Sequence, residues 1–147
     1  MPLHIDYKQA EPTAQTAMLG FNKYVGTTGI DPTLRHLIDV RASPINGCSY
    51  CIDMHTQEAR RAGEAEHRLY ALSVWRETSF FNLAERCVLA LTEHVTSIAD
   101  GGVPSILEVE MREIFSDQEI IQLLMAIIHI NAWNRLGIAT GMQPQVR

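Results

Sequence analysis

The segment that begins at Ser116 constrains the fold more than any other part of this sequence. Ser116 and Glu119 have the spacing of a capping box, in which each side chain bonds the backbone N–H of the other residue. Phe115 and Ile120 can pack together across the same helix start. The helix that follows is apolar on almost every side, through Ile120, Ile121, Leu123, Leu124, Met125, Ala126, Ile127, Ile128 and Ile130. Such a helix lies at the centre of a domain or in a subunit interface.

Two further helices are predicted around residue 45. Asp31-Pro32 supplies an N-cap and a first-turn proline, so a helix should begin there. Ser43-Pro44 should end it, because the residue before a proline avoids the helical region. A second helix should start near Asn46-Gly47 and run to Gly63, where glycine can adopt the left-handed cap conformation.

The remaining segments also favour helices over strands. Asn82 and Glu85 have the spacing of another capping box. Weaker helical patterns fit residues 12–25, 65–76 and 104–114, with a loop over 99–104. Apolar residues recur at intervals of three and four rather than two. We therefore expect one all-α domain over residues 1–147, with about six or seven helices, that oligomerises through its apolar helices.

Composition and charge exclude several classes of protein. Apolar residues make up 46% of the 147 and charged residues 20%, which is a globular composition. The 12 Lys and Arg against 17 Asp and Glu give a net charge of −5, so we expect no nucleic-acid or membrane partner. No apolar run reaches the roughly 20 residues of a membrane span, and residues 1–6 lack signal-peptide features. A soluble, cytoplasmic protein is expected.

The chemistry is concentrated in residues 45–55, Ile-Asn-Gly-Cys-Ser-Tyr-Cys-Ile-Asp-Met-His. On a helix, Cys48, Cys51 and His55 fall on one face, and Cys51 and His55 can touch because they are four residues apart. Cys48 and Cys51 are close enough for a disulfide. In a reducing compartment this spacing is typical of redox-active or metal-binding cysteines.

A thiolate is favoured at this position. A helix start carries partial positive charge and unpaired N–H groups, and His55 can accept the Cys51 proton. A thiolate with a second thiol nearby can attack a peroxide, become a sulfenic acid and be resolved as a disulfide. It can also exchange with an external dithiol.

Other interpretations of the motif stay open. Cys48 and Cys51 can be core cysteines without chemistry. Together with His55 they can supply three zinc ligands, although no second Cys-x-x-Cys or His-x-x-x-His provides a fourth. A thioredoxin fold is disfavoured, because its motif follows a strand and here a helix precedes. We predict no resident metal or cofactor.

Residues 40–55 resemble the core of the AhpD-like alkylhydroperoxidase branch of the carboxymuconolactone decarboxylase family. The match continues through residues 56–63, and Phe115-Ser116-Asp117 and residues 131–135 also resemble the family. The resemblance implies an all-helical fold that assembles as a homotrimer or homohexamer. It implies a thiol peroxidase in which Cys51 attacks a hydroperoxide, Cys48 resolves it as a disulfide, and His55 belongs to a proton relay. A dithiol, for example on a lipoylated protein, re-reduces the disulfide.

This sequence departs from the family pattern at one relay position. The family usually has a glutamate twelve residues before the first cysteine, and here that residue is His36. A neutral imidazole can pass a proton but brings no negative charge to orient His55. Either His36 substitutes in the relay or peroxidase activity is reduced.

Three further residues carry side chains that could take part in function. Cys87 lies on an apolar stripe and is expected in the core. Glu93 is expected at a solvated helix end rather than in a pocket. His129 lies in the apolar helix and is expected to be a hydrogen-bonded core or interface histidine.

The sequence therefore predicts a hydroperoxide reductase that uses Cys48, Cys51, His55 and His36. The alternatives are an oligomeric redox-sensing module without turnover, a disulfide oxidoreductase with little peroxidase activity, and a zinc-binding domain.

Overall fold

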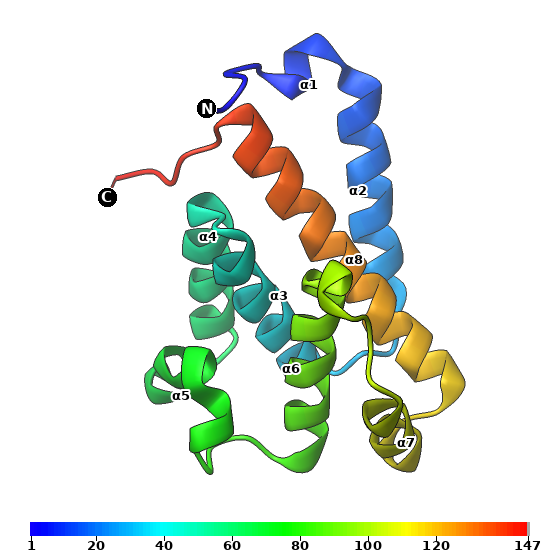
Figure 1. The fold of residues 1–147 in the computed structure, drawn as a ribbon. Coiled ribbons are helices and arrows are strands. Elements are labelled where there is room, and N and C mark those ends of the chain that lie inside the picture. Colours follow the sequence, from blue (N-terminus) through cyan, green and yellow to red (C-terminus); the bar gives the residue numbers. More distant parts are fainter. Residues whose placement is uncertain (147) are drawn as a thin grey trace.

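The computed structural model describes residues 1–146, and in this part of the chain it contains helices and no strand (Figure 1). The helices are α1 (Tyr7–Ala10), α2 (Pro12–Thr27), α3 (Pro32–Asn46), α4 (Ser49–Arg61), α5 (Glu66–Ala71), η1 (Leu72–Glu77), α6 (Leu83–Thr96), η2 (Ile98–Asp100), α7 (Ser105–Ile114) and α8 (Asp117–Thr140). The all-α prediction is confirmed. The additional helix is the single turn α1, which is capped by the Asp6 carboxylate and anchored by buried Tyr7.

Helix α3 lies at the centre of the bundle and packs against α4, α6 and α8. Helix α8 crosses the whole molecule, with α2 along its other side and both chain ends at the same end of the bundle (Figure 1). The predicted central helix is confirmed by Leu123, Ala126, Ile127 and Ile130, which are buried. Ile121 and Ile128 of the same helix stay about half exposed.

Two hydrophobic clusters meet at α3 and α6. One is formed by α2, α3, α6, α7 and α8 and includes the buried thiol of Cys87, as expected for that residue. The other lies under α5 and η1, where Trp75 and Phe81 pack on Leu37 and Leu89. Together they fix the position of α3, the helix that leads into the cysteine motif.

The predicted end of α3 at Ser43-Pro44 is wrong, because the helix continues through Pro44 to Asn46. Tertiary contacts outweigh the local preference of the residue before proline. Ser43 is fully buried, and its Oγ donates to the Asp39 carbonyl at 2.7 Å. Pro44 is on the exposed side of α3, so its ring needs no space in the core.

The next helix, expected to start near Asn46-Gly47, begins two residues later at Ser49. Gly47 has φ +78° and caps α3 in the left-handed conformation, where glycine has no steric penalty. The N-cap of α4 is Cys48. Only Gly47 and Cys48 lie between α3 and α4, so the first cysteine of the motif stands at the start of α4.

Both predicted capping boxes are present, at Asn82 and Glu85 for α6 and at Ser116 and Glu119 for α8. Residues 65–76 divide into α5 and η1 between Ala71 and Leu72, and Val74 inside η1 has non-helical backbone angles. Part of the predicted loop over 99–104 belongs to η2.

A buried polar network ties the end of α3 to α8. Asn46 Nδ2 donates to Asn131 Oδ1 at 2.9 Å and to Asn134 Oδ1 at 2.8 Å. Asn134 Nδ2 in turn donates to Ser43 Oγ at 3.2 Å. Asn134 is fully buried, so both of its bonds replace lost hydration.

Replacing Asn134 by Ala should lower the free energy of unfolding by about 2–3 kcal/mol, because it removes one hydrogen bond from each of Asn46 and Ser43 and leaves space at a fully buried position. Urea denaturation measures this change. Gln118→Ala, an exposed position of the same helix, should change stability by less than about 0.5 kcal/mol. Equal effects of the two substitutions would show that the network contributes nothing.

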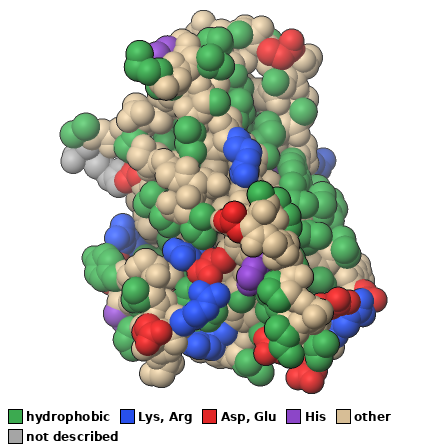
Figure 2. Space-filling view, viewed as in Figure 1, with side chains coloured by type: hydrophobic (Ala, Val, Ile, Leu, Met, Phe, Trp, Pro, Cys, Tyr) green, Lys and Arg blue, Asp and Glu red, His purple; other side chains and the backbone are tan. Residues whose placement is uncertain are grey.

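The charged side chains on the face shown in Figure 2 gather over its lower half, where α5 and α6 lie. Arg76 of η1 pairs with Glu93 of α6. The upper part of this face is mostly hydrophobic or uncharged (Figure 2). Within the described residues, no helix is long and apolar enough to cross a membrane.

Candidate active site

The two motif cysteines meet at the first turn of α4. Cys48 and Cys51 are joined by a disulfide, with their Cα atoms 5.3 Å apart. The backbone N–H of Cys51 donates to Cys48 Sγ at 3.3 Å, so the Cys48 sulfur caps the helix. Both residues are buried, with 1% and 3% of their surface exposed. A helix N-terminus stabilises negative charge, so Cys48 is favoured as a thiolate when the disulfide opens.

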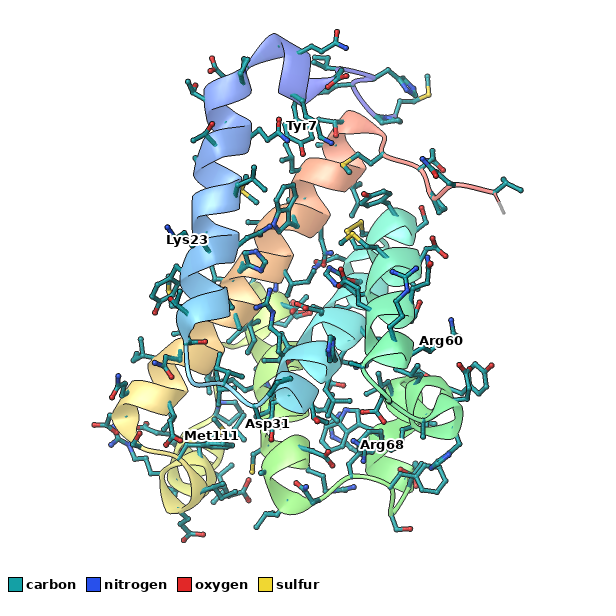
Figure 3. The ribbon with its side chains drawn as sticks, turned by 180° about the vertical axis from the view of Figure 1, so that it is seen from behind. Tyr7, Lys23, Asp31, Arg60, Arg68 and Met111 are labelled. Atoms are coloured by element: carbon teal, nitrogen blue, oxygen red, sulfur yellow. A yellow bond between two sulfur atoms is a disulfide. The ribbon has the colours of Figure 1, made fainter. Side chains whose placement is uncertain are left out.

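Helix α8 lies against the disulfide at Gly137 (Figure 3). A Cβ atom at this position would lie 3.4 Å from Cys48 Sγ and 3.9 Å from Cys51 Sγ. The same position is 3.6 Å from Met142 Sδ. The missing side chain therefore lets α8 approach both sulfur atoms, and Met142, just beyond the end of α8, lies beside them.

His55 follows Cys51 by one helical turn and is buried. Its Nδ1 lies 2.9 Å from Glu58 Oε2 and 3.7 Å from Asp39 Oδ2. Carboxylates accept hydrogen bonds, so Nδ1 carries a proton and donates it toward them. When His55 is neutral, Nε2 is left with a free lone pair. This atom is buried and has no hydrogen-bond partner among the described residues.

The two carboxylates make His55 a stronger base. Burial alone would disfavour the charged imidazole, but the hydrogen bond that His55 donates to Glu58 and the charges of Asp39 and Glu58 outweigh it and raise the pKa of His55. The hydrogen bond with His55 lowers the pKa of Glu58. Burial raises the pKa of Asp39, and the charges of His55 and Arg35 only partly offset this. Glu58 is therefore the partner of His55 that more readily stays negatively charged.

His36 lies on α3, one turn before Asp39. It lines a cavity together with Arg35, Asp39 and Glu58, and its Nδ1 is buried without a hydrogen-bond partner in residues 1–146. The structure thus places His36 beside the carboxylates, whereas Cys48, Cys51 and His55 share one face of α4.

Sequence reasoning missed Asp39 and Glu58. Glu58 follows His55 by three residues on one helix, a spacing at which side chains interact, so it was open to prediction. Asp39 comes from another helix, and only the packing of α3 on α4 brings it to His55.

A cavity of about 350 Å³ opens beside His55 between α2, α3, α4 and α8. Its walls are both apolar and polar, and they include Tyr7, Leu19, Asn22, Arg35, Asp39, Tyr50, Met54, His55, Glu58, His129, Trp133 and Met142. In Figure 3 Tyr7 lies beside the C-terminal end of α8, at the end of the bundle that holds the disulfide. We name this space the His55 cavity. Its size is within the range of small-molecule sites.

His129 forms the wall of the His55 cavity on α8. It is buried, its Nε2 contacts Asn22 Oδ1, and Phe21 packs edge-on against its ring. Burial lowers the pKa of His129 to about 4, and positive charge on Arg35 and His55 acts in the same direction. The residue is the hydrogen-bonded histidine expected from the sequence, although it also lines a cavity.

The lowered pKa of His129 predicts acid destabilisation. Between about pH 6.5 and pH 4 the unfolded state binds more protons at this residue than the folded state does, so stability falls as pH falls through that range. The contribution should be about 2 kcal/mol after solvent screening. Urea denaturation over this range should give a flatter pH profile for His129→Gln than for the parent protein. Parallel profiles would contradict the prediction.

The expectation that Glu93 stands at a solvated helix end is wrong. Glu93 accepts hydrogen bonds from Arg41, Trp75 and Arg76, so it anchors α3 and η1 rather than ending a solvated helix.

Among residues 1–146 no group of three His, Cys, Asp or Glu side chains is placed to hold a metal ion.

Comparisons with known proteins agree with this arrangement. The model of the carboxymuconolactone decarboxylase family matches residues 12–94. The uncharacterised protein YdfG of Bacillus subtilis (strain 168) is 39% identical over 141 residues, which cover 96% of each chain.

Solved structures share the fold. A crystal structure from Agrobacterium tumefaciens, described as a protein of unknown function and a candidate antioxidant defence protein AhpD, is 39% identical with a TM-score of 0.95, covering 98% of this chain and 99% of its own. The debrominase Bmp8 has a TM-score of 0.83 at 22% identity, covering 99% of this chain and 78% of its own. The chain therefore belongs to the carboxymuconolactone decarboxylase family, in the AhpD-like branch that carries a Cys-x-x-Cys pair.

Proposed function

We propose that the protein is a thiol-dependent hydroperoxide reductase that uses Cys48 and Cys51 as its redox pair. The observation that carries this proposal is the buried disulfide at a helix start, one turn from a histidine held by two carboxylates. The likeness to a candidate AhpD protein of Agrobacterium tumefaciens supports the same class of reaction.

In the first step the Cys51 thiolate attacks the terminal oxygen of R–O–O–H. His55, with its raised pKa, takes the proton of the Cys51 thiol and holds it. A sulfur–oxygen bond forms, the oxygen–oxygen bond breaks, and the leaving alkoxide takes the proton from His55. The products are an alcohol and a Cys51 sulfenic acid.

In the second step Cys48 resolves the sulfenic acid. Its thiolate, which the helix start favours, attacks Cys51 Sγ, the disulfide forms and the sulfur–oxygen bond breaks. The hydroxide leaves as water by taking up the proton that the Cys48 thiol released when it ionised. The two thiols have then supplied the two electrons that reduced the peroxide. Since the helix start already places the two residues at disulfide distance, little rearrangement is needed.

Glu58 and Asp39 orient His55 in this scheme, with Nδ1–H toward the carboxylates and Nε2 free to exchange a proton. We propose that His36 forms the outer end of the relay, because it shares a cavity with both carboxylates. The negative charge that the family has at position 36 is supplied here by residues 39 and 58. His36 is thus assigned a role in proton transfer, and the two carboxylates the role of positioning.

An external dithiol, for example on a lipoylated partner protein, would return the enzyme to its reduced form. Its thiolate attacks one sulfur, the other leaves as a thiolate, and the second thiol of the reductant completes the exchange. Cys48 is the favoured leaving thiolate, because it accepts the Cys51 N–H at the helix start. Such reductants are kept available in the cytoplasm, which is where we propose that the protein acts.

A disulfide oxidoreductase with little peroxidase activity is the second candidate. The disulfide at the helix start favours it, because such a pair can exchange with a dithiol without any peroxide. A redox-sensing module without turnover would share this feature.

Steady-state turnover separates these candidates. With dihydrolipoamide in excess, the reductase should consume many equivalents of cumene hydroperoxide per protein. A disulfide oxidoreductase would exchange with the dithiol but leave the hydroperoxide unconsumed. A sensor would form its disulfide once and stop. Either of the last two results would overturn the proposed function.

We also propose that the protein is a homotrimer or homohexamer. Ile121 and Ile128 of α8 and Ile106 and Val109 of α7 expose 41% to 65% of their surface, an apolar area that a second copy would cover. Light scattering should give a mass of three or six chains, and a monomeric mass would contradict this.

A further inference from the structure

The His55 cavity holds a positive charge that the proposed reaction does not use. Arg35 of α3 lines this cavity, and its Nε–H donates to Asp39 Oδ2 at 3.2 Å. Its other N–H groups, on the two Nη atoms, form no hydrogen bond with any of residues 1–146. The side chain is 24% exposed and neither Nη atom is fully buried, so both are open to a ligand.

The guanidinium group of Arg35, and not only its aliphatic stem, lies among the walls of the cavity. Besides burial, its positive charge acts to lower the pKa of His55 on α4 and of His129 on α8. The same charge acts on the carboxylates of Asp39 and Glu58. All four of these side chains line the cavity. Since charges in a protein act strongly only over short distances, the guanidinium lies close to each of these walls.

A second cation belongs to the same cavity. Lys8 of α1 lines it, and its ammonium group forms no ion pair with any of the described residues. Lys8 is exposed, which places it at the mouth of the cavity. Two positive charges, from α1 and α3, are therefore available to a ligand that enters.

The negative charges of the cavity are already engaged by its own residues. Asp39 Oδ2 accepts the Arg35 Nε–H, and Asp39 Oδ1 is buried, so neither oxygen is open to a ligand. Glu58 Oε2 accepts the hydrogen bond from His55 Nδ1 at 2.9 Å. The unused polar groups of the cavity are thus mainly cationic donors, which select a ligand with negative charge and hydrogen-bond acceptors.

The rest of the cavity fits an apolar body. Leu19, Met54, Trp133 and Met142 line it from α2, α4, α8 and the segment after α8. Its volume of about 350 Å³ is sufficient for a small organic molecule. A guanidinium with two free Nη groups matches the two oxygens of a carboxylate, because its planar fork can donate to both at once.

We propose that the His55 cavity binds organic acids that carry a carboxylate on an apolar body, with the carboxylate accepting hydrogen bonds from the two Nη atoms of Arg35. The Lys8 ammonium adds attraction for the same charge. The site includes neither Cys48 nor Cys51. It is therefore a ligand site beside His55, separate from the thiols, and it goes beyond the proposed reductase reaction.

Three probes of one shape test the inference on the oxidised, disulfide form. They are 3-phenylpropanoate, 3-phenylpropanamide and 3-phenylpropylamine, which share the ring and chain but carry a negative, a neutral and a positive head group at pH 7. Calorimetry should show that the acid binds about tenfold more tightly than the amide, through charge-assisted hydrogen bonds. The amine should bind more weakly than the amide, because Arg35 and Lys8 repel it.

Variants of Arg35 locate the preference. Arg35→Gln should reduce the preference for the acid over the amide to less than about twofold. Because this change also removes a partner of the buried Asp39, Arg35→Lys is the second variant. It keeps the charge but loses the planar fork, and the preference should fall to about threefold. Lys23→Gln is the control, since Lys23 is an exposed cation of α2 outside the cavity, and it should leave the preference unchanged.

A further measurement needs no variant. The indole N–H signal of Trp133, which lines the cavity, should move when 3-phenylpropanoate is added, and that of Trp75, which lies outside it, should not. Equal affinity for the acid and the amide, tighter binding of the amine, an unchanged preference in both Arg35 variants, or a constant Trp133 signal would overturn the inference. None of these experiments involves peroxide or free thiols, so their failure is distinct from failure of the proposed reductase activity.

Discussion

Replacing Cys51 by Ser should reduce hydroperoxide turnover to the uncatalysed background. A serine hydroxyl is not ionised near neutral pH and has no sulfur to accept the oxygen. Consumption of cumene hydroperoxide with excess dithiothreitol measures the effect. Cys87→Ser is the matched control, because Cys87 is a buried core thiol whose pKa is raised by desolvation, and its turnover should stay within about twofold of the parent.

The Cys48→Ser variant should complete the first step of the reaction but not the second. Cys51 should still react once, but its sulfenic acid has no resolving thiol and should accumulate, where dimedone traps it. Peptide mass spectrometry should locate the adduct on Cys51. The opposite pattern, an adduct on Cys48 in the Cys51→Ser protein, would show that the helix-capping cysteine attacks the peroxide and would contradict the assigned roles.

Replacing His55 by Gln should slow the reaction of the reduced protein with peroxide by about a hundredfold, the usual contribution of a positioned general base. Stopped-flow measurement of thiol oxidation gives this rate. Gln keeps a polar side chain beside Glu58 and Asp39 but accepts no proton. His94→Gln, on another helix, should leave the rate unchanged.

The two carboxylates should act through His55 rather than on the substrate. Glu58→Gln removes the hydrogen-bonded partner that helps to raise the pKa of His55, so the pH at which the rate is half-maximal should move down. Asp39→Asn should shift it in the same direction. A loss of rate without any shift in the pH profile would contradict this positioning role.

The fold was predictable where local signals and packing agree. The capping boxes at Ser116 and Asn82 occur at the expected positions, because side chain and backbone satisfy each other within four residues. The helix boundaries at residues 43–48 were not predictable in the same way. There the burial of Ser43 and its bond from Asn134, 91 residues away, outweigh the effect of Pro44.

The residues of the candidate site were also predictable only where a local pattern connects them. The Cys48, Cys51 and His55 cluster follows from spacing on one helix, and the structure places all three together on α4. Asp39, Asn22 and His129 come from three other helices, and no local pattern connects them to His55. Their arrangement depends on how α2, α3, α4 and α8 pack. No short segment of the sequence reveals that packing.

Peroxide itself should drive formation of the Cys48–Cys51 disulfide. The most direct test is to add one equivalent of cumene hydroperoxide to the fully reduced protein and follow its intact mass and the alcohol product over time. The protein should lose two hydrogen atoms, gain no oxygen and yield one equivalent of alcohol within a single turnover. Oxidation no faster than that of free cysteine, or of the Cys51→Ser protein, would contradict it.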